Sequence, residues 1–225
     1  GAAIMKIEVE QDIMQVNKRY AAENRALFAA HDVKAINILG SPGAGKTALL
    51  ERLLSGKGRG MRAAVIEGDL ATARDAERIA ALGIPVVQIN TDGGCHLDAR
   101  MIAKTLPMFD LDQIDLLLIE NVGNLVCPAA FDLGEQARLV VLSLAEGGDK
   151  PSKYPATFFS ADAVALNKTD LLPYIDVDLE QVKADLRAIK PDIRIFEACC
   201  RANAESGMEQ IWDYLAGEGK QGQGV

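Results

Sequence analysis

The run GSPGAGKT, from Gly40 to Thr47, carries the most specific chemistry in this sequence. It matches the pattern G-x-x-x-x-G-K-[ST], in which glycines let backbone N–H groups turn toward phosphate oxygens. We expect Lys46 to reach the β and γ phosphates of a nucleotide and the Thr47 hydroxyl to bind Mg²⁺. The predicted phosphate-site residues are Gly40, Ser41, Pro42, Gly43, Ala44, Gly45, Lys46, Thr47 and Ala48.

Two acidic residues stand at the ends of apolar runs, where ligands gather in a parallel sheet. Glu120 ends the run DLLLIE, and Asp69 follows AAVIEG. Because Mg²⁺ takes oxygen ligands, partly through water, we predict a magnesium site from Thr47, Asp69 and Glu120. With Lys46, Asp69 is the predicted catalytic residue, holding a magnesium-bound water or orienting the attacking water. The alternative for each acid is an exposed carboxylate at a strand end.

The run NKTD, from Asn167 to Asp170, indicates which base the nucleotide carries. A carboxylate at Asp170 accepts hydrogen bonds from both N1–H and the exocyclic amine of guanine, and adenine has no such pair of donors. Asn167 would tie this loop to the phosphate loop, and the Lys168 stem would cover one face of the base. The backbone near Ala198 and Cys199 falls where a last guanine contact would lie; alternatively Cys199 and Cys200 are small buried apolar residues.

A second group of residues has the types that bind transition metals. Cys95 and His96 are neighbours after a Gly93-Gly94 pair that allows the chain to turn, and Cys127 lies seven residues after Glu120. Thiolates with an imidazole suit Zn²⁺ or Ni²⁺, but three ligands leave a tetrahedral site incomplete, and a second subunit would complete or double it. From the residues alone, an incidental Cys-His pair is an equal alternative.

These residues require an α/β scaffold. Apolar runs without polar alternation predict strands covered on both faces at residues 35–39, 63–67, 86–90, 115–120, 137–144, 163–167 and 193–198. Helical patterns cover residues 12–31, 46–55, 71–83, 178–190 and 208–217. The alternation predicts a P-loop NTPase fold, with a mostly parallel sheet flanked by helices on both faces. We expect one GTP-binding domain over residues 1–217, beginning with a helix, and a disordered tail at 218–225.

Composition narrows the classes of function. The formal net charge is −8, from 24 basic and 32 acidic side chains, which argues against general nucleic-acid binding. There is no stretch of 18 apolar residues and no signal-peptide pattern, so we expect no membrane association. Four cysteines without a dense framework fit a reducing compartment, and we expect a cytoplasmic protein.

Taken together, the motifs resemble those of the hydrogenase maturation GTPases that assist nickel insertion into [NiFe] hydrogenase. The resemblance spans about residues 5 to 215 and rests on GSPGAGKT, GCHLDA, IENVGNLVCPAAFDLGE, AEGGDKPSKYP and NKTD, in this order. It implies a dimerising P-loop GTPase with a metal at the subunit interface, held by residues that fall here on Cys95, His96 and Cys127. It also implies as partners a second nickel-binding maturation protein and the hydrogenase large subunit.

Two further implications concern lysines and missing ligands. In AEGGDKPSKYP, Lys150 and Lys153 are candidates to reach the partner's nucleotide; the alternative is two solvated lysines. Some relatives carry a Cys-rich N-terminal metal motif or a His-rich run, and neither is present, since residues 1–30 contain no Cys or His. Arg100 stands where a further His would have helped coordination.

The resulting prediction is a slow GTPase and metallochaperone that couples GTP·Mg²⁺ to dimerisation and to Ni²⁺ or Zn²⁺ at the interface. A urease-type nickel-insertion GTPase is one alternative, although its metal motif is expected to be Cys-Pro-His. A metal-storage or sensor protein with a vestigial nucleotide site is another. A small-molecule kinase is a third, and NKTD argues against it.

Overall fold

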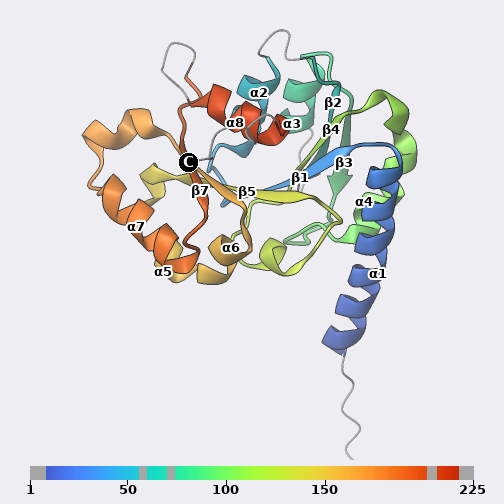
Figure 1. The fold of residues 1–225 in the computed structure, drawn as a ribbon, viewed down its shortest axis with the longest axis horizontal. Coiled ribbons are helices and arrows are strands. Elements are labelled where there is room, and N and C mark those ends of the chain that lie inside the picture. The colour runs from blue at the N-terminus through green and yellow to red at the C-terminus, as the bar shows by residue number, and fades with distance from the viewer. Residues whose placement is uncertain (1–8, 56–59, 70–73, 202–206, 218–225) are drawn as a thin grey trace, which may run out of the picture.

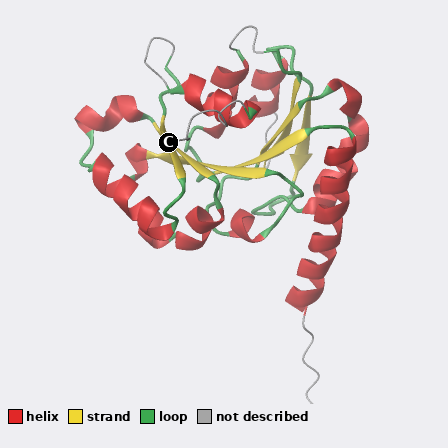
Figure 2. Cartoon of the chain, in the orientation of Figure 1, coloured by secondary structure: helices red, strands yellow, loops and turns green. Residues whose placement is uncertain are grey.

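A seven-stranded sheet, in which every paired strand runs parallel, forms the centre of the molecule (Figures 1 and 2). This computed structural model describes residues 9–55, 60–69, 74–201 and 207–217. The strands are β1 Lys34–Leu39, β2 Ala63–Asp69, β3 Val86–Asn90, β4 Leu116–Glu120, β5 Ala137–Ser143, β6 Ala163–Asn167 and β7 Arg194–Glu197. Their order across the sheet is β3-β2-β4-β1-β5-β6-β7.

Helices cover both faces of the sheet (Figure 1). One face carries α2 Lys46–Leu54, α3 Arg74–Ala80 and α8 Met208–Ala216. The other carries α1 Val9–Ala30, α4 Ala99–Thr105, α6 Pro155–Ser160 and α7 Leu179–Ile189. A short helix, α5 Lys150–Lys153, precedes α6. Short 3₁₀ helices lie at Leu106–Met108, Leu111–Gln113, Cys127–Ala130, Leu144–Glu146 and Thr169–Tyr174.

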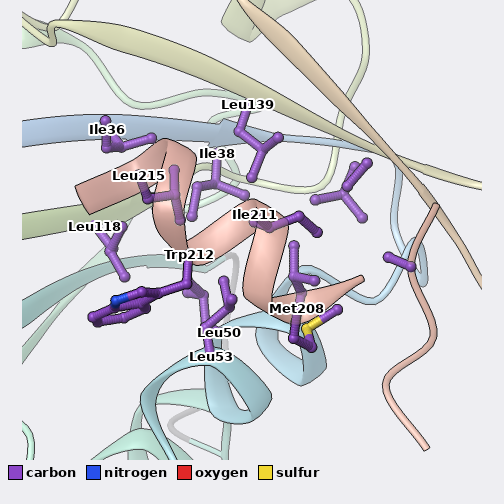
Figure 3. Packing of buried hydrophobic residues seen from close by; sticks show 14 of the residues in the cluster. Ile36, Ile38, Leu50, Leu53, Leu118, Leu139, Met208, Ile211, Trp212 and Leu215 are labelled. Atoms are coloured by element: carbon purple, nitrogen blue, oxygen red, sulfur yellow. The ribbon is translucent and has the colours of Figure 1, made fainter. Parts of the chain in front are cut away.

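Side-chain alternation on the central strand explains the two cores. Ile36 and Ile38 of β1 are fully buried against α2 and α8, with Trp212 closing the cluster (Figure 3). Ala35 and Leu39 point to the opposite face, toward α1 and α6 respectively. Successive side chains of a strand alternate between faces, so a strand buried on both sides is mostly apolar; Asn37 is a buried polar residue within β1.

The predicted α/β class, the parallel sheet and all seven strands are confirmed. The five predicted helices are present with small changes at their ends, and the first begins at Val9. Of the predicted 71–83 helix, residues 71–73 lie outside the described part; the helix ends at Ala80 rather than at 83, because residues 81–83 form a turn that ends at Gly83. Helices α4, α5 and α6 were not predicted from the sequence. The expected tail at 218–225 also lies outside the described residues, and the domain span of 1–217 stays a prediction. Within the described ranges, no helix combines the length and apolarity needed to cross a bilayer.

Candidate functional site

The phosphate loop connects the carboxyl end of β1 to the amino end of α2. Gly43 and Gly45 take φ values of 76° and 93°, in the left-handed region that favours glycine. At Gly45 a side chain would also be excluded by Asn167, whose Nδ2 would lie 2.5 Å from an added Cβ. The backbone conformation at Gly43 and Gly45, and the contact of Gly45 with Asn167, therefore favour glycine at both positions.

A cavity of about 360 Å³ opens above this loop. On one side it is lined by Pro42, Gly43, Gly45, Lys46, Thr47 and Ala48, and on the other by Glu67, Gly68, Asp75, Arg78, Glu120, Asn121, Val122 and Gly123. The loop after β1 and the ends of β2 and β4 thus face a common space, as expected where parallel strands end at one edge.

Three predicted residues meet in this cavity. The Thr47 hydroxyl donates a hydrogen bond to Glu120 Oε1 over 2.9 Å. Lys46 Nζ lies 3.9 Å from the same oxygen and 3.5 Å from the carbonyl of Ser41. Glu120 Oε2 is buried without a hydrogen-bond partner among the described residues. A hydroxyl beside a carboxylate with an unused oxygen fits a hard cation such as Mg²⁺.

Glu67 belongs to this site but was not predicted from the sequence. It is paired in register with Glu120 on the neighbouring strand and is 2% exposed, and its Oε2 has no hydrogen-bond partner in the part of the chain that the structure describes. Glu67 and Asp69 lie two residues apart on β2. A charged residue inside an otherwise apolar strand was the signal available. Asp69 ends β2 as predicted, and its side chain lies outside the described part.

The carboxyls of Glu67 and Glu120, on paired positions of neighbouring strands, affect each other's pKa. Burial, and then the charge of Glu120, raise the pKa of Glu67 to about 10. Burial also raises the pKa of Glu120, but Lys46 and the hydrogen bonds to Glu67 and Thr47 oppose that shift. We therefore place the proton on Glu67 and the negative charge on Glu120. Two adjacent buried carboxyls cannot both ionise without a compensating cation.

The NKTD loop lies directly against the phosphate loop. Asn167 Nδ2 donates to the carbonyl of Ala44 over 2.9 Å, and Lys168 Nζ donates to the carbonyl of Gly43 over 2.8 Å. Lys168 itself has a positive φ of 65°. The geometry joins the predicted base-binding loop to the predicted phosphate-binding loop, so that one ligand can contact both.

Asp170 is held by the segment that follows β7. Cys199 Sγ lies 3.3 Å from Asp170 Oδ1, and Arg201 Nη1 lies 3.3 Å from Oδ2. Ala198 is fully buried, and its carbonyl accepts a hydrogen bond from the Thr169 backbone. Ala198 and Cys199 therefore adjoin the predicted base site. Arg201 was missed by the sequence reasoning, because an exposed arginine after a strand carries no distinctive pattern.

Lys150 and Lys153 are both engaged within the chain. Lys150 Nζ lies 3.4 Å from Glu146 Oε2, and Lys153 forms an ion pair with Asp149. Glu146 also accepts a hydrogen bond from the Ser41 hydroxyl of the phosphate loop. The segment that was predicted to lie near the nucleotide is thus joined to the phosphate loop through Glu146.

The three predicted metal ligands also come together. Ligand atoms of Cys95, His96 and Cys127 all lie within 4.8 Å of one another, and Cys95 Sγ is 3.6 Å from His96 Nδ1. A tetrahedral site with bonds of about 2.0–2.3 Å separates its ligand atoms by about 3.3–3.8 Å, so small movements would allow all three to bind one ion. The donor set fits Zn²⁺ or Ni²⁺.

The pKa shifts of Cys95 and His96 affect metal binding in opposite ways, because a metal binds a thiolate and a neutral imidazole. A hydrogen bond with Cys127, together with burial, raises the pKa of the Cys95 thiol. Burial lowers the pKa of His96, against a smaller opposing effect of Asp98. The imidazole is therefore neutral, as a ligand must be, and an incoming metal would displace the thiol protons. The His96 ring is further fixed by stacking on Phe131, with centroids 3.9 Å apart.

Local turns aim the two ligand-bearing loops at each other. Between β3 and α4, Thr91 exchanges hydrogen bonds with Gly94, and Gly93 takes a φ of 91°. Asp98 then caps α4 by accepting from the Met101 N–H. Cys127 begins a 3₁₀ helix in the loop after β4. Because β3 and β4 flank β2, both loops meet across the end of β2.

Comparison with known proteins agrees with this geometry. Residues 34–197 match the family described as CobW/HypB/UreG, nucleotide-binding domain. The hydrogenase maturation factor HypB of Azotobacter vinelandii is 52% identical over 206 residues, covering 92% of this chain and 68% of that protein.

Two solved structures are similar over nearly their whole length. The crystal structure of hydrogenase maturation factor HypB from Archaeoglobus fulgidus has a TM-score of 0.84 at 41% identity, covering 91% of this chain and 98% of that one. HypB from Helicobacter pylori, solved in complex with nickel, has a TM-score of 0.85 at 36% identity, covering 93% of this chain and 99% of that one.

Proposed function

The chain belongs to the CobW/HypB/UreG family of nucleotide-binding domains and, within it, to the hydrogenase maturation factors HypB, and on this premise we propose that it binds and hydrolyses GTP to assist nickel insertion into [NiFe] hydrogenase. The observation that carries the proposal is the segment from Glu120 to Cys127. It begins at an acid of the phosphate cavity and ends at a ligand of the Cys-His-Cys cluster.

For GTP binding, the glycines of the phosphate loop present backbone N–H groups, and Lys46 supplies a positive charge. Asp170 selects guanine by accepting two hydrogen bonds, while Asn167 and Lys168 hold the base loop against the phosphate loop. Ala198 and Cys199 add backbone contacts to the base.

For hydrolysis, Thr47, Glu120 and Asp69 form the magnesium site, and Glu67 supports it from the adjacent strand. When bound, Mg²⁺ neutralises phosphate charge and orients the γ phosphate. Lys46 stabilises the charge that develops on the phosphate oxygens, and Asp69 orients the attacking water. We expect a slow intrinsic rate, as suits a switch rather than a metabolic enzyme.

For metal transfer, Cys95, His96 and Cys127 form one half of a Ni²⁺ or Zn²⁺ site. The matching half comes from a second copy of the chain, in a GTP-favoured homodimer related by a two-fold axis. Lys150 and Lys153 would leave their intrachain partners and reach the partner's nucleotide. A second nickel-binding maturation protein and the hydrogenase large subunit are the proposed partners, in the cytoplasm.

The test is the affinity for Ni²⁺ in two nucleotide states. We expect the dissociation constant measured with GDP and with a non-hydrolysable GTP analogue to differ by about fivefold or more. Identical affinities in the two states would refute the coupling. Retained nickel affinity in a double variant, Cys95→Ala with Cys127→Ala, would show that the site lies elsewhere. GDP affinity of the double variant, expected to be nearly unchanged, controls for folding.

A further inference from the structure

Beneath the metal loops lies a buried network of polar side chains centred on Asn121, the residue that follows Glu120. Asn121 is 1% exposed. Its Oδ1 accepts hydrogen bonds from the backbone N–H of Leu97 and of Val122, each over 3.0 Å. Leu97 directly follows His96 in sequence. One side chain thus connects the end of β4 with the loop that carries two of the three metal ligands.

The same network continues to the loop that carries the third ligand. Asn121 Nδ2 donates to Asn37 Oδ1, and Asn37 Nδ2 donates to Glu135 Oε1, each over 3.2 Å. Glu135 accepts from Arg138 Nε over 2.6 Å. Arg138 in turn donates to the carbonyls of Ala129 and Phe131, over 2.8 and 2.9 Å. These two carbonyls lie just after Cys127, and Phe131 is the residue that stacks on His96.

On its other side, the segment after Glu120 rests on the phosphate loop. The Asn121 N–H donates to the carbonyl of Ile38, and the Asn124 N–H donates to the carbonyl of Gly40. At Gly123 an added Cβ would lie 3.0 Å from Pro42 backbone atoms. A displacement of the phosphate loop or of Glu120 must therefore move this segment.

Leu97 makes a second connection between the sites. It is fully buried, and its side chain would lie 2.8 Å from a Cβ added at Gly68. Gly68 sits on β2 between Glu67 and Asp69. Leu97 is accordingly held from two directions, by its N–H to Asn121 and by its side chain to the end of β2.

We propose that Asn121 is the positioning residue through which nucleotide state changes metal affinity, by holding the Leu97 backbone in register with the end of β4. This inference rests on the proposed function and deepens it, since it names the side chain that transmits the coupling. Asn121 lines the phosphate cavity, but its side-chain Oδ1 and Nδ2 form hydrogen bonds within the chain, to Leu97, Val122 and Asn37. Its proposed role is to fix the distance between the Cys95-His96 loop and Cys127.

The chain offers a matched control for the test. Asn24 of α1 is also a buried asparagine, 2% exposed, and its Nδ2 donates to the carbonyls of Ala99 and Leu133 over 2.8 and 2.9 Å. It supports the same two loops as Asn121 does, but from α1 rather than from the end of β4. Removing either side chain loosens the loops, and only the Asn121 change breaks the link to the phosphate cavity.

The experiment measures the Ni²⁺ dissociation constant by competition with a chromophoric chelator, in the presence of GDP and of a non-hydrolysable GTP analogue. For the wild type, the ratio of the two constants is expected to be about fivefold or more. For Asn121→Ala the ratio is expected to fall to within about twofold of one, whereas Asn24→Ala weakens binding in both states and keeps the wild-type ratio. A wild-type ratio retained in Asn121→Ala, or lost equally in Asn24→Ala, overturns the role of Asn121.

A wild-type ratio of one overturns the proposed coupling itself, so the two failures are distinguishable. If Asn121→Ala does not bind GDP, through unfolding or through a change in the cavity wall, the same measurement is made on Asn37→Ala, which is not among the cavity-lining residues. That change removes the acceptor of Asn121 Nδ2 and interrupts the path to Glu135. Its ratio is expected to fall to half of the wild-type value or less, and an unchanged ratio overturns the proposal.

Discussion

Among single residues, Glu67 has the largest consequence for the nucleotide site. It places a protonated carboxyl beside the charged Glu120 in a cavity that is built for phosphate oxygens and a cation. The pair is costly to bury with both groups ionised, and a bound divalent cation would remove that cost. We therefore expect the protein without nucleotide to be the less stable form.

This predicts a pH dependence of stability. Because the pKa of Glu67 rises from 4.5 to about 10 on folding, the stability that its protonated form contributes is complete below about pH 4.5 and is lost as the pH rises toward 10. The free energy of unfolding of nucleotide-free protein should fall with pH by up to about 1.4 kcal/mol per unit from this group. Urea unfolding at several pH values measures this dependence, and Glu67→Gln should make the free energy of unfolding less dependent on pH. An unchanged pH dependence in Glu67→Gln would contradict the assignment. Glu180→Gln, at an exposed position, is the control.

A substitution at Asp170 tests whether the protein recognises guanine. In Asp170→Asn the amide still accepts from N1–H, but its NH₂ group repels the exocyclic amine of guanine and favours the C2 carbonyl of xanthine. The variant loses a charge-assisted hydrogen bond and places two N–H donors against each other, so GDP binding should weaken by about 100-fold. Binding of xanthosine diphosphate (XDP) should improve. Fluorescent-nucleotide titrations measure both affinities. Equal losses for the two nucleotides would indicate that Asp170 holds the loop through Cys199 and Arg201 rather than the base.

Among the elements, α4 has the closest connection to the metal cluster. It starts three residues after His96, and its first turn is fixed by the Asp98 cap. The Ala99 N–H also receives support from α1, since it donates to Asn17 Oδ1 over 2.8 Å. The loop that contains Cys95 and His96 is thus fixed at its end by the hydrogen bonds of Asp98 and Asn17 to the start of α4.

Substitutions at two helix N-caps can distinguish an effect on stability from an effect on nickel binding. Asp98→Ala and Asp178→Ala each remove an N-cap, on α4 and α7 respectively, and each should lower the free energy of unfolding by about 1 kcal/mol. Only Asp98→Ala should also weaken Ni²⁺ binding, because α7 lies away from the cluster. Thermal unfolding and chelator competition on both variants provide the comparison. Equal nickel affinities would mean that the Cys95-His96 loop is fixed without its cap.

At the scale of the whole molecule, the proposed metal half-site and the phosphate cavity share one edge of the sheet. Both are built from loops at the carboxyl ends of β1, β2, β3 and β4. A second copy that docked at this edge would meet both at once. This is why we expect nucleotide and metal to affect assembly together.

Sedimentation measurements can separate the two contributions to assembly. With a GTP analogue and Ni²⁺ together, the mass in solution should shift from that of one chain to that of two. In Cys127→Ala the part of the shift that depends on Ni²⁺ should disappear, and the part that depends on the nucleotide should remain. A nickel-dependent shift that survives the substitution would place the interface metal on other residues.

The sequence by itself determined the strands and the phosphate-loop motif, and it predicted the base motif and the three candidate metal ligands. It could do so because these features depend on local patterns: apolar runs of strand length, glycines where the backbone turns, and residue types at short spacing. For example, the tie between Asn167 and the phosphate loop was expected from the motif and is present.

Only the tertiary structure decided which residues far apart in the chain are neighbours. Glu67 meets Glu120 because β2 and β4 pair in register, and Asn121 meets Leu97 because the loops after β3 and β4 converge across β2. Strand order is set by how the helices pack on both faces, and no local pattern encodes it. From the residues alone, a metal site and an incidental Cys-His pair were equal alternatives, because Cys127 lies on a different loop. The order of the strands brings Cys95, His96 and Cys127 together.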